Sequence, residues 1–236
     1  GLEFIHRRYK AKLAALYFQS WTNTYDSADN LKHIYDMALS CGDFSEFIVS
    51  TRPDCVEDDV ADLLAGYITK DREVWVELGL QSASDETLRR INRGHTLSDY
   101  IKCMERLHKR GIKVCTHVIL GLPGEEREDF IETAKVLNEV GSEGVKIHNL
   151  HIPGGTKMAE EYLEGEITSW STERYMNEVE YFLRLLNPEM IIERLVCETP
   201  SHRLMAPRHF MDKSLFLRTL NDKMEKDNTR QGDLYE

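Results

Sequence analysis

The stretch Val114–Glu125, Val-Cys-Thr-His-Val-Ile-Leu-Gly-Leu-Pro-Gly-Glu, decides the fold that the sequence predicts. An apolar run rich in β-formers ends in Gly-Leu-Pro-Gly-Glu, and the amphipathic pattern Glu126–Val140 follows at once. This junction places a glycine-rich loop at the carboxyl end of a strand, where α/β proteins bind ligands. Two glycines allow close approach of the backbone, and Pro123 stiffens the turn. We expect a ligand-binding loop; the alternative is a tight βα loop that binds nothing.

Apolar runs typical of strands alternate with helical periods on both sides of this junction. The expected strands are Leu13–Gln19, Glu46–Thr51, Val74–Leu80, Val114–Leu120, Gly144–Leu150 and Ile191–Val196. The expected helices are Ala28–Leu39, Val56–Thr69, Asp85–Ile91, Leu97–Lys109, Glu126–Val140 and Ser171–Leu186. This order predicts an α/β fold with a parallel sheet, either open or closed into a partial barrel. Beyond Glu160 the alternation loosens, and Met211–Glu236 predicts one amphipathic helix with a polar end.

Composition sets limits on the class of protein. The chain has 236 residues, 41% of them hydrophobic, which suffices for one α/β domain with a sizeable core. Neither an apolar run long enough to span a membrane nor a signal-peptide pattern occurs, so we expect a cytoplasmic protein that binds no membrane. The net charge of −11 makes nucleic acid an unlikely partner, because such partners need a basic stripe.

The five cysteines, at positions 41, 55, 103, 115 and 197, have no spacing typical of a zinc or iron–sulfur site. Cys103 lies at an apolar position of an expected helix and Cys115 within an expected strand, so both are expected in the core. We expect Cys197 to be a lone buried thiol as well.

Polar residues gather where the expected strands end, in five successive clusters. They are Gln19–Thr24, Ser50–Asp54, Glu77–Ser82, His117 with the following turn, and Lys146–Thr156. Because the carboxyl ends of parallel strands meet at one edge, we expect a binding site there.

Several of these polar residues also have structural explanations. Thr24 and Ser84 are expected to cap helices. Glu77 lies inside an apolar run, where an unpaired carboxylate would cost several kcal/mol, and Lys146 or Arg52 could pair with it. His148 and His151 are three residues apart and point to opposite faces of a strand, which disfavours a joint metal site.

In combination, these motifs resemble one family. Gly-Leu-Gln-Ser followed by Asn-Arg-Gly-His, then His-Val-Ile-Leu-Gly-Leu-Pro-Gly-Glu, then His-Asn-Leu-His-Ile-Pro-Gly-Gly-Thr, closely resemble radical S-adenosylmethionine (radical SAM) proteins. The nearest branch is the YhcC/YtqA type, related to the Elp3-like and oxygen-independent coproporphyrinogen oxidase branches. The resemblance implies a partial (β/α)6 TIM-like barrel over residues 1–159 with a C-terminal strand–helix extension over residues 160–236.

The resemblance also implies two cofactors, S-adenosylmethionine and a [4Fe–4S] cluster held by a Cys-x3-Cys-x2-Cys loop after the family's first strand. This chain lacks that motif, and Leu13–Gln19 corresponds to the family's second strand. We therefore expect a truncated, inactive form whose cluster cysteines lie upstream of Gly1, so that the cluster is present only in the full-length protein. Residues 1–12 are expected to fold over the exposed edge of Leu13–Gln19, or a second copy to pair with it as a homo-oligomer.

The family's S-adenosylmethionine contacts can be transferred to matching positions. Gln19 and Ser20 replace its glycine-rich motif near the methionine amino group, and Ser50 stands where relatives often have a glutamate. The full set of expected cofactor-binding residues is Gln19, Ser20, Ser50, Gln81, Arg93, His117, Gly121, Leu122 and Leu150.

The leading hypothesis is an oxidoreductase whose full-length form cleaves S-adenosylmethionine to a 5′-deoxyadenosyl radical, with an unknown substrate and an electron donor as partners. The alternatives are a tRNA-modifying, Elp3-like enzyme, suggested by Thr51–Asp54, and a noncatalytic nucleotide-binding module. His202 and Arg203 are candidates to face the substrate.

Overall fold

The computed structural model describes residues 7, 8 and 10–236. One six-stranded sheet has the order β1 (Ala15–Phe18), β2 (Glu46–Thr51), β3 (Glu73–Gln81), β4 (Lys113–Leu120), β5 (Gly144–Asn149) and β7 (Ile191–Arg194). The pairs β1–β2, β2–β3 and β5–β7 are parallel. Strand order therefore follows chain order, with helices between the strands. This confirms the predicted α/β topology of a partial (β/α)6 barrel.

The helices alternate with these strands. They are α2 (Ala28–Leu39), α3 (Asp58–Ala65), α4 (Asp85–Arg90), α5 (Leu97–His108), α6 (Arg127–Val140), α7 (Lys157–Glu164), α8 (Thr172–Leu185) and α9 (Lys213–Asp227), with a short 3-10 helix, η1 (Pro53–Cys55). The predicted helix Val56–Thr69 is shorter at both ends. Helix α7 was not predicted, although its sequence carries signals for both ends. The side chain of Thr156 caps the start by accepting a hydrogen bond from Ala159 N at 3.2 Å, and Gly165 follows the last turn with a left-handed backbone conformation.

The chain divides into two compact units. Unit 1 contains Gly1–Leu80 and Ser98–Thr116, and unit 2 contains Gln81–Leu97 and His117–Glu236. Cys103 in α5 and Cys115 in β4, both in unit 1, are fully buried, as expected.

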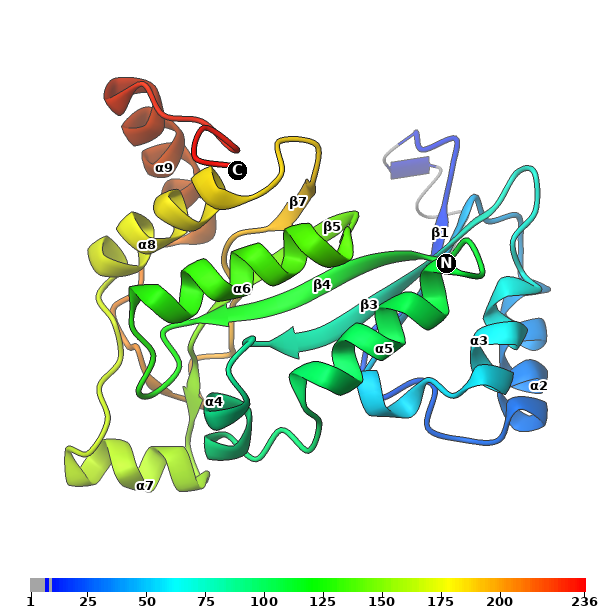
Figure 1. Cartoon of the computed structure of the whole chain (residues 1–236), viewed down its shortest axis with the longest axis horizontal. Coiled ribbons are helices and arrows are strands. Elements are labelled where there is room, and N and C mark those ends of the chain that lie inside the picture. The colour runs from blue at the N-terminus through cyan, green and yellow to red at the C-terminus, as the bar shows by residue number, and fades with distance from the viewer. Residues whose placement is uncertain (1–6, 9) are drawn as a thin grey trace. The chain divides into compact units, whose positions relative to one another are not determined.

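Unit 1 is held together by an aromatic cluster of Phe18, Tyr35, Phe47 and Tyr67. Their rings meet edge to face, with centroids 5.1 to 6.1 Å apart. Helices α2 and α3 lie side by side here (Figure 1), and Tyr35 and Phe47 are almost completely buried. The cluster joins residues of β1 and β2 to α2 and to the turn after α3, so it is one of the packing contacts that hold this unit together.

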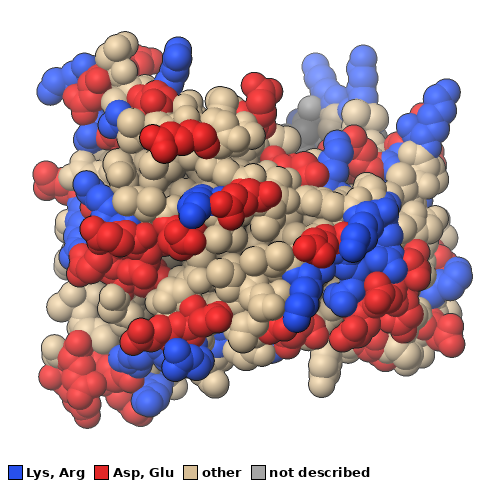
Figure 2. Space-filling model, viewed as in Figure 1, with Lys and Arg blue, Asp and Glu red and all other residues tan. Residues whose placement is uncertain are grey.

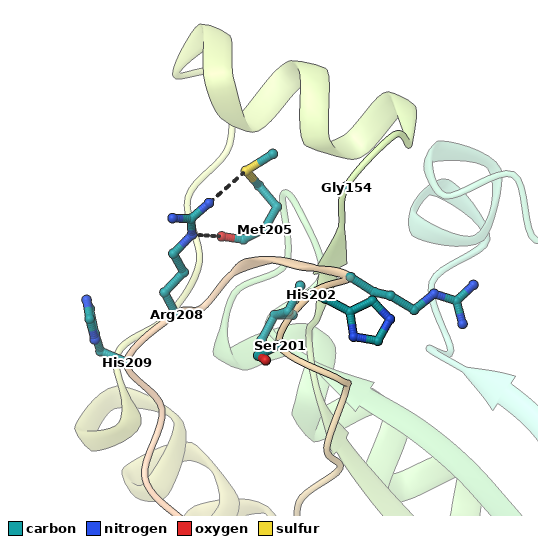
Figure 3. A pocket seen from close by; sticks show the side chains of 8 residues that line it. Gly154, Ser201, His202, Met205, Arg208 and His209 are labelled. Carbon is teal, nitrogen blue, oxygen red and sulfur yellow. Dashed lines mark hydrogen bonds between the residues drawn. The ribbon is translucent and has the colours of Figure 1, made fainter.

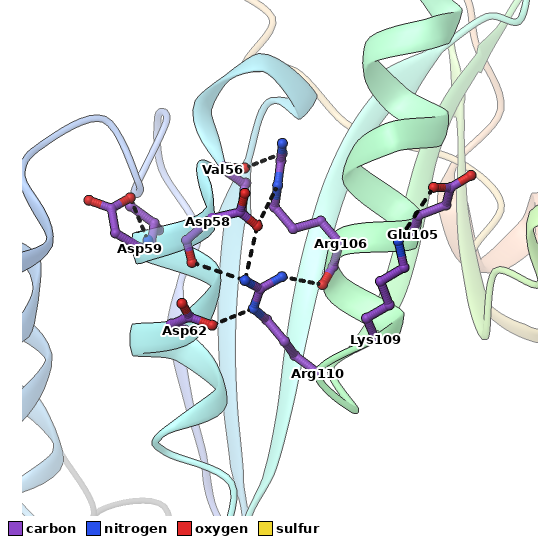
Figure 4. Close-up of polar contacts among 9 residues, drawn as sticks. Val56, Asp58, Asp59, Asp62, Glu105, Arg106, Lys109 and Arg110 are labelled. Atoms are coloured by element: carbon purple, nitrogen blue, oxygen red, sulfur yellow. Dashed lines mark hydrogen bonds and ion pairs between the residues drawn. The ribbon is translucent and has the colours of Figure 1, made fainter.

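Charged contacts join α3 and α5 at the surface of unit 1 (Figure 4). Arg110 donates hydrogen bonds to Asp62 at 2.6 Å and to Asp58 at 2.9 Å, and Arg106 donates to the carbonyl of Val56 at 2.6 Å. Both aspartates are largely exposed. Because water screens such pairs, each contributes little to stability.

In unit 2, α6 packs on α8 (Figure 1), and the short strands β6 (Ile152–Pro153) and β8 (Leu204–Ala206) form a separate antiparallel pair. A small apolar cluster lies behind this pair. Its buried members are Ile152, Ala159, Ile167 and Ala206. The two-stranded sheet, which was not predicted, therefore anchors the loop around β8 to the end of β5.

In the described part of the chain, no helix combines the length and apolarity needed to cross a bilayer. Basic side chains are interspersed with acidic ones over the face seen in Figure 2. Strand β1 ends the sheet order. Residues 1–6 and 9 lie outside the described residues, so the prediction that residues 1–12 cover this edge stays a prediction.

The aromatic cluster and the surface ion pairs predict different mutational costs. Phe47→Ala should lower the free energy of unfolding by about 3–5 kcal/mol, because it leaves a cavity among buried rings. Arg110→Ala should lower it by much less, because water screens the ion pairs of its guanidinium. Urea unfolding followed by circular dichroism measures both. A larger loss for Arg110→Ala than for Phe47→Ala would contradict this account of unit 1.

Candidate functional site

In unit 1, a buried carboxylate lies among hydroxyl groups on three neighbouring strands. Glu77 of β3 is 2% exposed and accepts hydrogen bonds from Tyr17 Oη and, at 3.1 Å, from Ser50 Oγ. Ser50 and Glu77 are register partners, which places the two side chains on the same face. Ser50, a predicted cofactor contact, thus bonds to the protein's own carboxylate.

The segment after β1 is fixed to the end of β2 by Asn23. Its side-chain amide donates to the carbonyls of Phe18 and Ser50, both at 3.0 Å, and its main-chain N–H also donates to Ser50 O at 3.1 Å. Gln19 and Ser20 precede it and are exposed. They are therefore accessible to a ligand at the carboxyl end of β1.

Two predictions for unit 1 are wrong. Thr24 does not cap a helix: its hydroxyl contacts Thr51 Oγ1 and donates to Cys55 O, while Ser27 caps α2. Arg52 is not the partner of Glu77, because its guanidinium bonds to Asp54 two residues along the chain. Arg52 is paired locally within the turn after β2, whereas the hydroxyl of Thr24 reaches across to that turn from the segment after β1.

In unit 2, the segments after β3 and β4 are joined by a buried hydrogen bond. Ser82 Oγ donates to Glu125 Oε1 and accepts from Ser84 N at 3.0 Å, and both Ser82 and Glu125 are at least 95% buried. Ser84 caps α4 by accepting from Thr87 N at 3.2 Å, as predicted. Gln81, just before Ser82, has φ +75°, which is uncommon for a residue with a side chain.

Burial raises the pKa of Glu125 to about 7, and the hydrogen bonds from Ser82 and Thr87 only partly oppose this effect. Glu125 is the last residue of the Gly-Leu-Pro-Gly-Glu stretch. The sequence identified the loop but not this role of its carboxylate, which ties the loop to the segment that follows β3.

The loop after β4 has a structural reason for its glycine. Gly121 has φ +92°, and a Cβ built there would lie 3.1 Å from the indole ring of Trp170. Leu122 is buried, and Leu150, half-buried, packs against the apolar cluster behind β6. The sequence predicted that the backbone of this loop closely approaches a ligand. On one side of Gly121 the close neighbour is the protein's own Trp170 ring.

The predicted residue His117 stacks on His148 of the next strand, with ring centroids 5.3 Å apart. Lys146, two residues before His148, forms an ion pair with Glu193 at 3.1 Å. The last predicted contact, Arg93, is half-buried in the loop that follows α4. The predicted residues therefore divide between the units, with Gln19, Ser20 and Ser50 in unit 1 and the other six in unit 2.

The predicted polar segment after β5 forms a cluster with Cys197 and Thr199, two partners that the sequence did not reveal. His151 contacts Thr199 Oγ1 at 2.6 Å and Asn149 Nδ2 at 2.8 Å, and Cys197 Sγ lies 3.3 Å from Asn149 Oδ1. Burial lowers the pKa of His151 and raises that of the Cys197 thiol to about 11. Cys197 is thus a protonated thiol with polar neighbours rather than an isolated core residue.

The residues of this chain do not fit a [4Fe–4S] cluster, which needs several thiolates at one place. Among the residues that the structure describes, no three His, Cys, Asp or Glu side chains are grouped so that they could hold a metal ion. Cys103 and Cys115 are buried in the core of unit 1, and Cys197 belongs to unit 2.

Comparison with known proteins gives a consistent result along the chain. The model of the radical SAM superfamily matches residues 7–137, and that of the radical SAM C-terminal domain matches residues 142–226. YtqA of Bacillus subtilis is 34% identical over 98% of this chain and 72% of its own length. YhcC of Escherichia coli is 39% identical over 84% of this chain and 64% of its own length. The predicted resemblance is confirmed.

Among solved structures, an archaeal Elp3 from Methanocaldococcus infernus with an N-terminal deletion superposes with a TM-score of 0.83. It is 19% identical, and the match covers 98% of this chain and 58% of that one. This likeness supports the fold.

The raised pKa of Glu125 predicts how stability depends on pH. Between pH 4.5 and 7 the folded protein retains a proton that the unfolded chain has released, so stability is complete below pH 4.5 and falls as the pH rises to 7. The loss is roughly 3 kcal/mol. In Glu125→Gln, the amide oxygen still accepts from Ser82, and this loss should disappear.

Urea unfolding at pH 4.5, 6 and 7.5 measures the difference between wild type and variant. Glu132→Gln, which removes an exposed carboxyl from α6, is the matched control and should follow the wild type. If Glu125→Gln also follows the wild type, the assignment of this titration to Glu125 is wrong.

Proposed function

Because the chain belongs to the radical SAM superfamily, we propose that the whole protein reductively cleaves S-adenosylmethionine and uses the 5′-deoxyadenosyl radical on an organic substrate. The observation that carries this proposal is the match of family models along residues 7–137 and 142–226. Members of this superfamily use S-adenosylmethionine and a [4Fe–4S] cluster. When bound, these cofactors supply the electron and the radical, and the protein supplies binding and orientation.

We propose that the 236-residue chain by itself is inactive, and that the cluster is present only in the full-length protein. The support is chemical: a cluster needs thiolate ligands grouped together, and the five cysteines of this chain lack the Cys-x3-Cys-x2-Cys spacing. The chain also spans only 64 to 72% of YhcC and YtqA.

The proposed S-adenosylmethionine contacts follow the strands of the sheet. Arg93 offers a guanidinium for the methionine carboxylate, for which bidentate, charge-assisted hydrogen bonds are suitable. Gln81 and His117 offer side-chain hydrogen bonds to the ribose. The exposed Gln19 and Ser20 and the buried Ser50 are proposed near the methionine amino group, and Gly121, Leu122 and Leu150 near the adenine ring. We assign residues 1–159 to the barrel and 160–236 to the C-terminal extension.

The remaining proposals concern partners and location. We propose a cytoplasmic protein that needs an electron donor, binds no nucleic acid and forms homo-oligomers through β1 if residues 1–12 leave that edge open. The mixture of acidic and basic side chains in Figure 2 and the net charge of −11 support the proposal that it binds no nucleic acid, because an RNA surface needs concentrated positive charge.

Anaerobic reconstitution tests the activity. The whole gene product and the 236-residue chain are each treated with iron, sulfide, dithionite and S-adenosylmethionine, and 5′-deoxyadenosine is measured by chromatography. We expect release by the whole product and none by the chain. Failure of the whole product to form a cluster or to release 5′-deoxyadenosine would favour a noncatalytic nucleotide-binding module, and release by the chain would contradict its proposed inactivity.

The same assay tests the contact residues. In the whole product, Arg93→Ala should raise the KM for S-adenosylmethionine about ten-fold or more, because charged hydrogen bonds contribute about 1.5–3 kcal/mol. Arg89→Ala, on the exposed face of α4, is the matched control and should leave KM unchanged. Equal effects of the two substitutions would remove Arg93 from the proposed site. Modification of tRNA by the whole product would identify tRNA as the substrate and favour the Elp3-like alternative.

A further inference from the structure

Residues 200–211, in the segment after β7, contain arginines but no acidic residue, with Glu198 and Asp212 flanking them on either side. Residues 200–211, Pro-Ser-His-Arg-Leu-Met-Ala-Pro-Arg-His-Phe-Met, contain two arginines and two histidines and no Asp or Glu. The loop lines a cavity of about 470 Å³. Figure 3 shows Ser201 and His202 on one stretch of the loop, Arg208 and His209 on another, and Gly154 on the neighbouring strand.

The arginines of this cavity have no carboxylate partner within residues 7–8 and 10–236. Arg208 donates to Met205 O at 3.2 Å, and no hydrogen bond or ion pair engages the guanidinium of Arg203 in that part of the chain. A second charged cavity in unit 2 differs in this respect. It contains Arg127, Arg184 and Lys223, and each of these forms an ion pair with Asp or Glu. The guanidinium groups of Arg203 and Arg208 therefore have N–H donors available for hydrogen bonds to an anion.

The walls of the cavity are fixed before any ligand binds. Gly154 N donates to Arg203 O at 2.8 Å, and β8 pairs with β6. Met205 packs against the buried cluster that contains Ile152 and Ala206. Because the main chain on both sides of Arg203 is held, ordering the loop costs little on binding.

A second cavity, of about 590 Å³, shares Leu204 and Arg208 with the first. Its other lining includes apolar surface from Pro207, Phe210 and Met211. The polar lining includes His151, Cys197 and the carboxylates of Glu198 and Asp212. Both volumes lie in the range typical of small-molecule sites. An anionic group beside Arg203 and Arg208 would thus leave room for an organic group against the apolar wall.

We propose that loop 200–211 binds the phosphate group of a small phosphate monoester, whose organic part occupies the adjoining cavity. Two guanidiniums and a serine hydroxyl suit the oxygens of a phosphate dianion, to which arginine can donate paired hydrogen bonds. The small volume of the cavity and the acidic remainder of the chain favour a small molecule over RNA. This binding needs no cluster, so it stands or fails independently of the proposed radical chemistry.

Binding to the 236-residue chain is measured by NMR titration of backbone amides, in a phosphate-free buffer at constant ionic strength. The probes are inorganic phosphate, phenyl phosphate and a short single-stranded RNA without a terminal phosphate. We expect saturable shifts at residues 200–211 with both phosphate probes, and tighter binding of phenyl phosphate because its ring enters the second cavity. Arg208→Ala and Arg203→Ala should each weaken phenyl phosphate binding about ten-fold.

Arg218→Ala, which removes an exposed arginine from α9, is the matched control and should leave binding within about two-fold of the wild type. Circular dichroism establishes that each variant is folded, and the two loop variants test the site independently. Equal weakening by Arg218→Ala, saturation by RNA alone, or no saturable shift with either phosphate probe would overturn the proposal.

Discussion

The hydrogen bond between Ser82 and Glu125 is the contact on which the geometry of the candidate site in unit 2 depends. A buried carboxyl must be protonated or hydrogen-bonded, and Glu125 meets this requirement with hydroxyls from the segment that follows β3. Gln81 immediately precedes Ser82, and Leu122 lies three residues before Glu125. One buried contact therefore fixes two segments that carry predicted ligand residues. Trp170, packed against Gly121, supports the same loop from the other side.

The sequence predicted the main elements because their signals are local. Apolar runs predicted the strands of the sheet, and Ser27 and Ser84 have the residue type and position of helix caps. Contacts between distant segments could not be predicted in the same way. Nothing near Gly121 in the sequence indicates that Trp170 fills the space beside it, and nothing near Cys197 indicates Asn149 as its neighbour. Thr24 and Arg52 were misassigned because their partners depend on the conformation of the turn after β2.

Two kinds of binding surface are proposed for this molecule, and they differ in physical origin. At the carboxyl ends of the strands, polar side chains follow apolar runs, and Glu77 and Glu125 are each held by hydroxyl groups. At loop 200–211, Arg203 and Arg208 are exposed and form no ion pair with a carboxylate in the described part of the chain. The first surface suits a cofactor with a ribose, an adenine and a zwitterionic end. The second suits a phosphate. A substrate with a phosphate group would be held by loop 200–211 of the C-terminal extension, while the proposed radical chemistry takes place at the carboxyl ends of the strands.

The most direct test of the central claim is an amide NMR titration of the chain with S-adenosylmethionine. The account predicts weak, saturable shifts at the strand ends, including Gln81, Gly121 and Leu122, with residues 200–211 unchanged. Binding should be weak because the family anchors the methionine end on iron, for which this chain lacks the ligands. No shift at the strand ends at saturation, or shifts confined to residues 200–211, would contradict the claim that these ends form the adenosyl site.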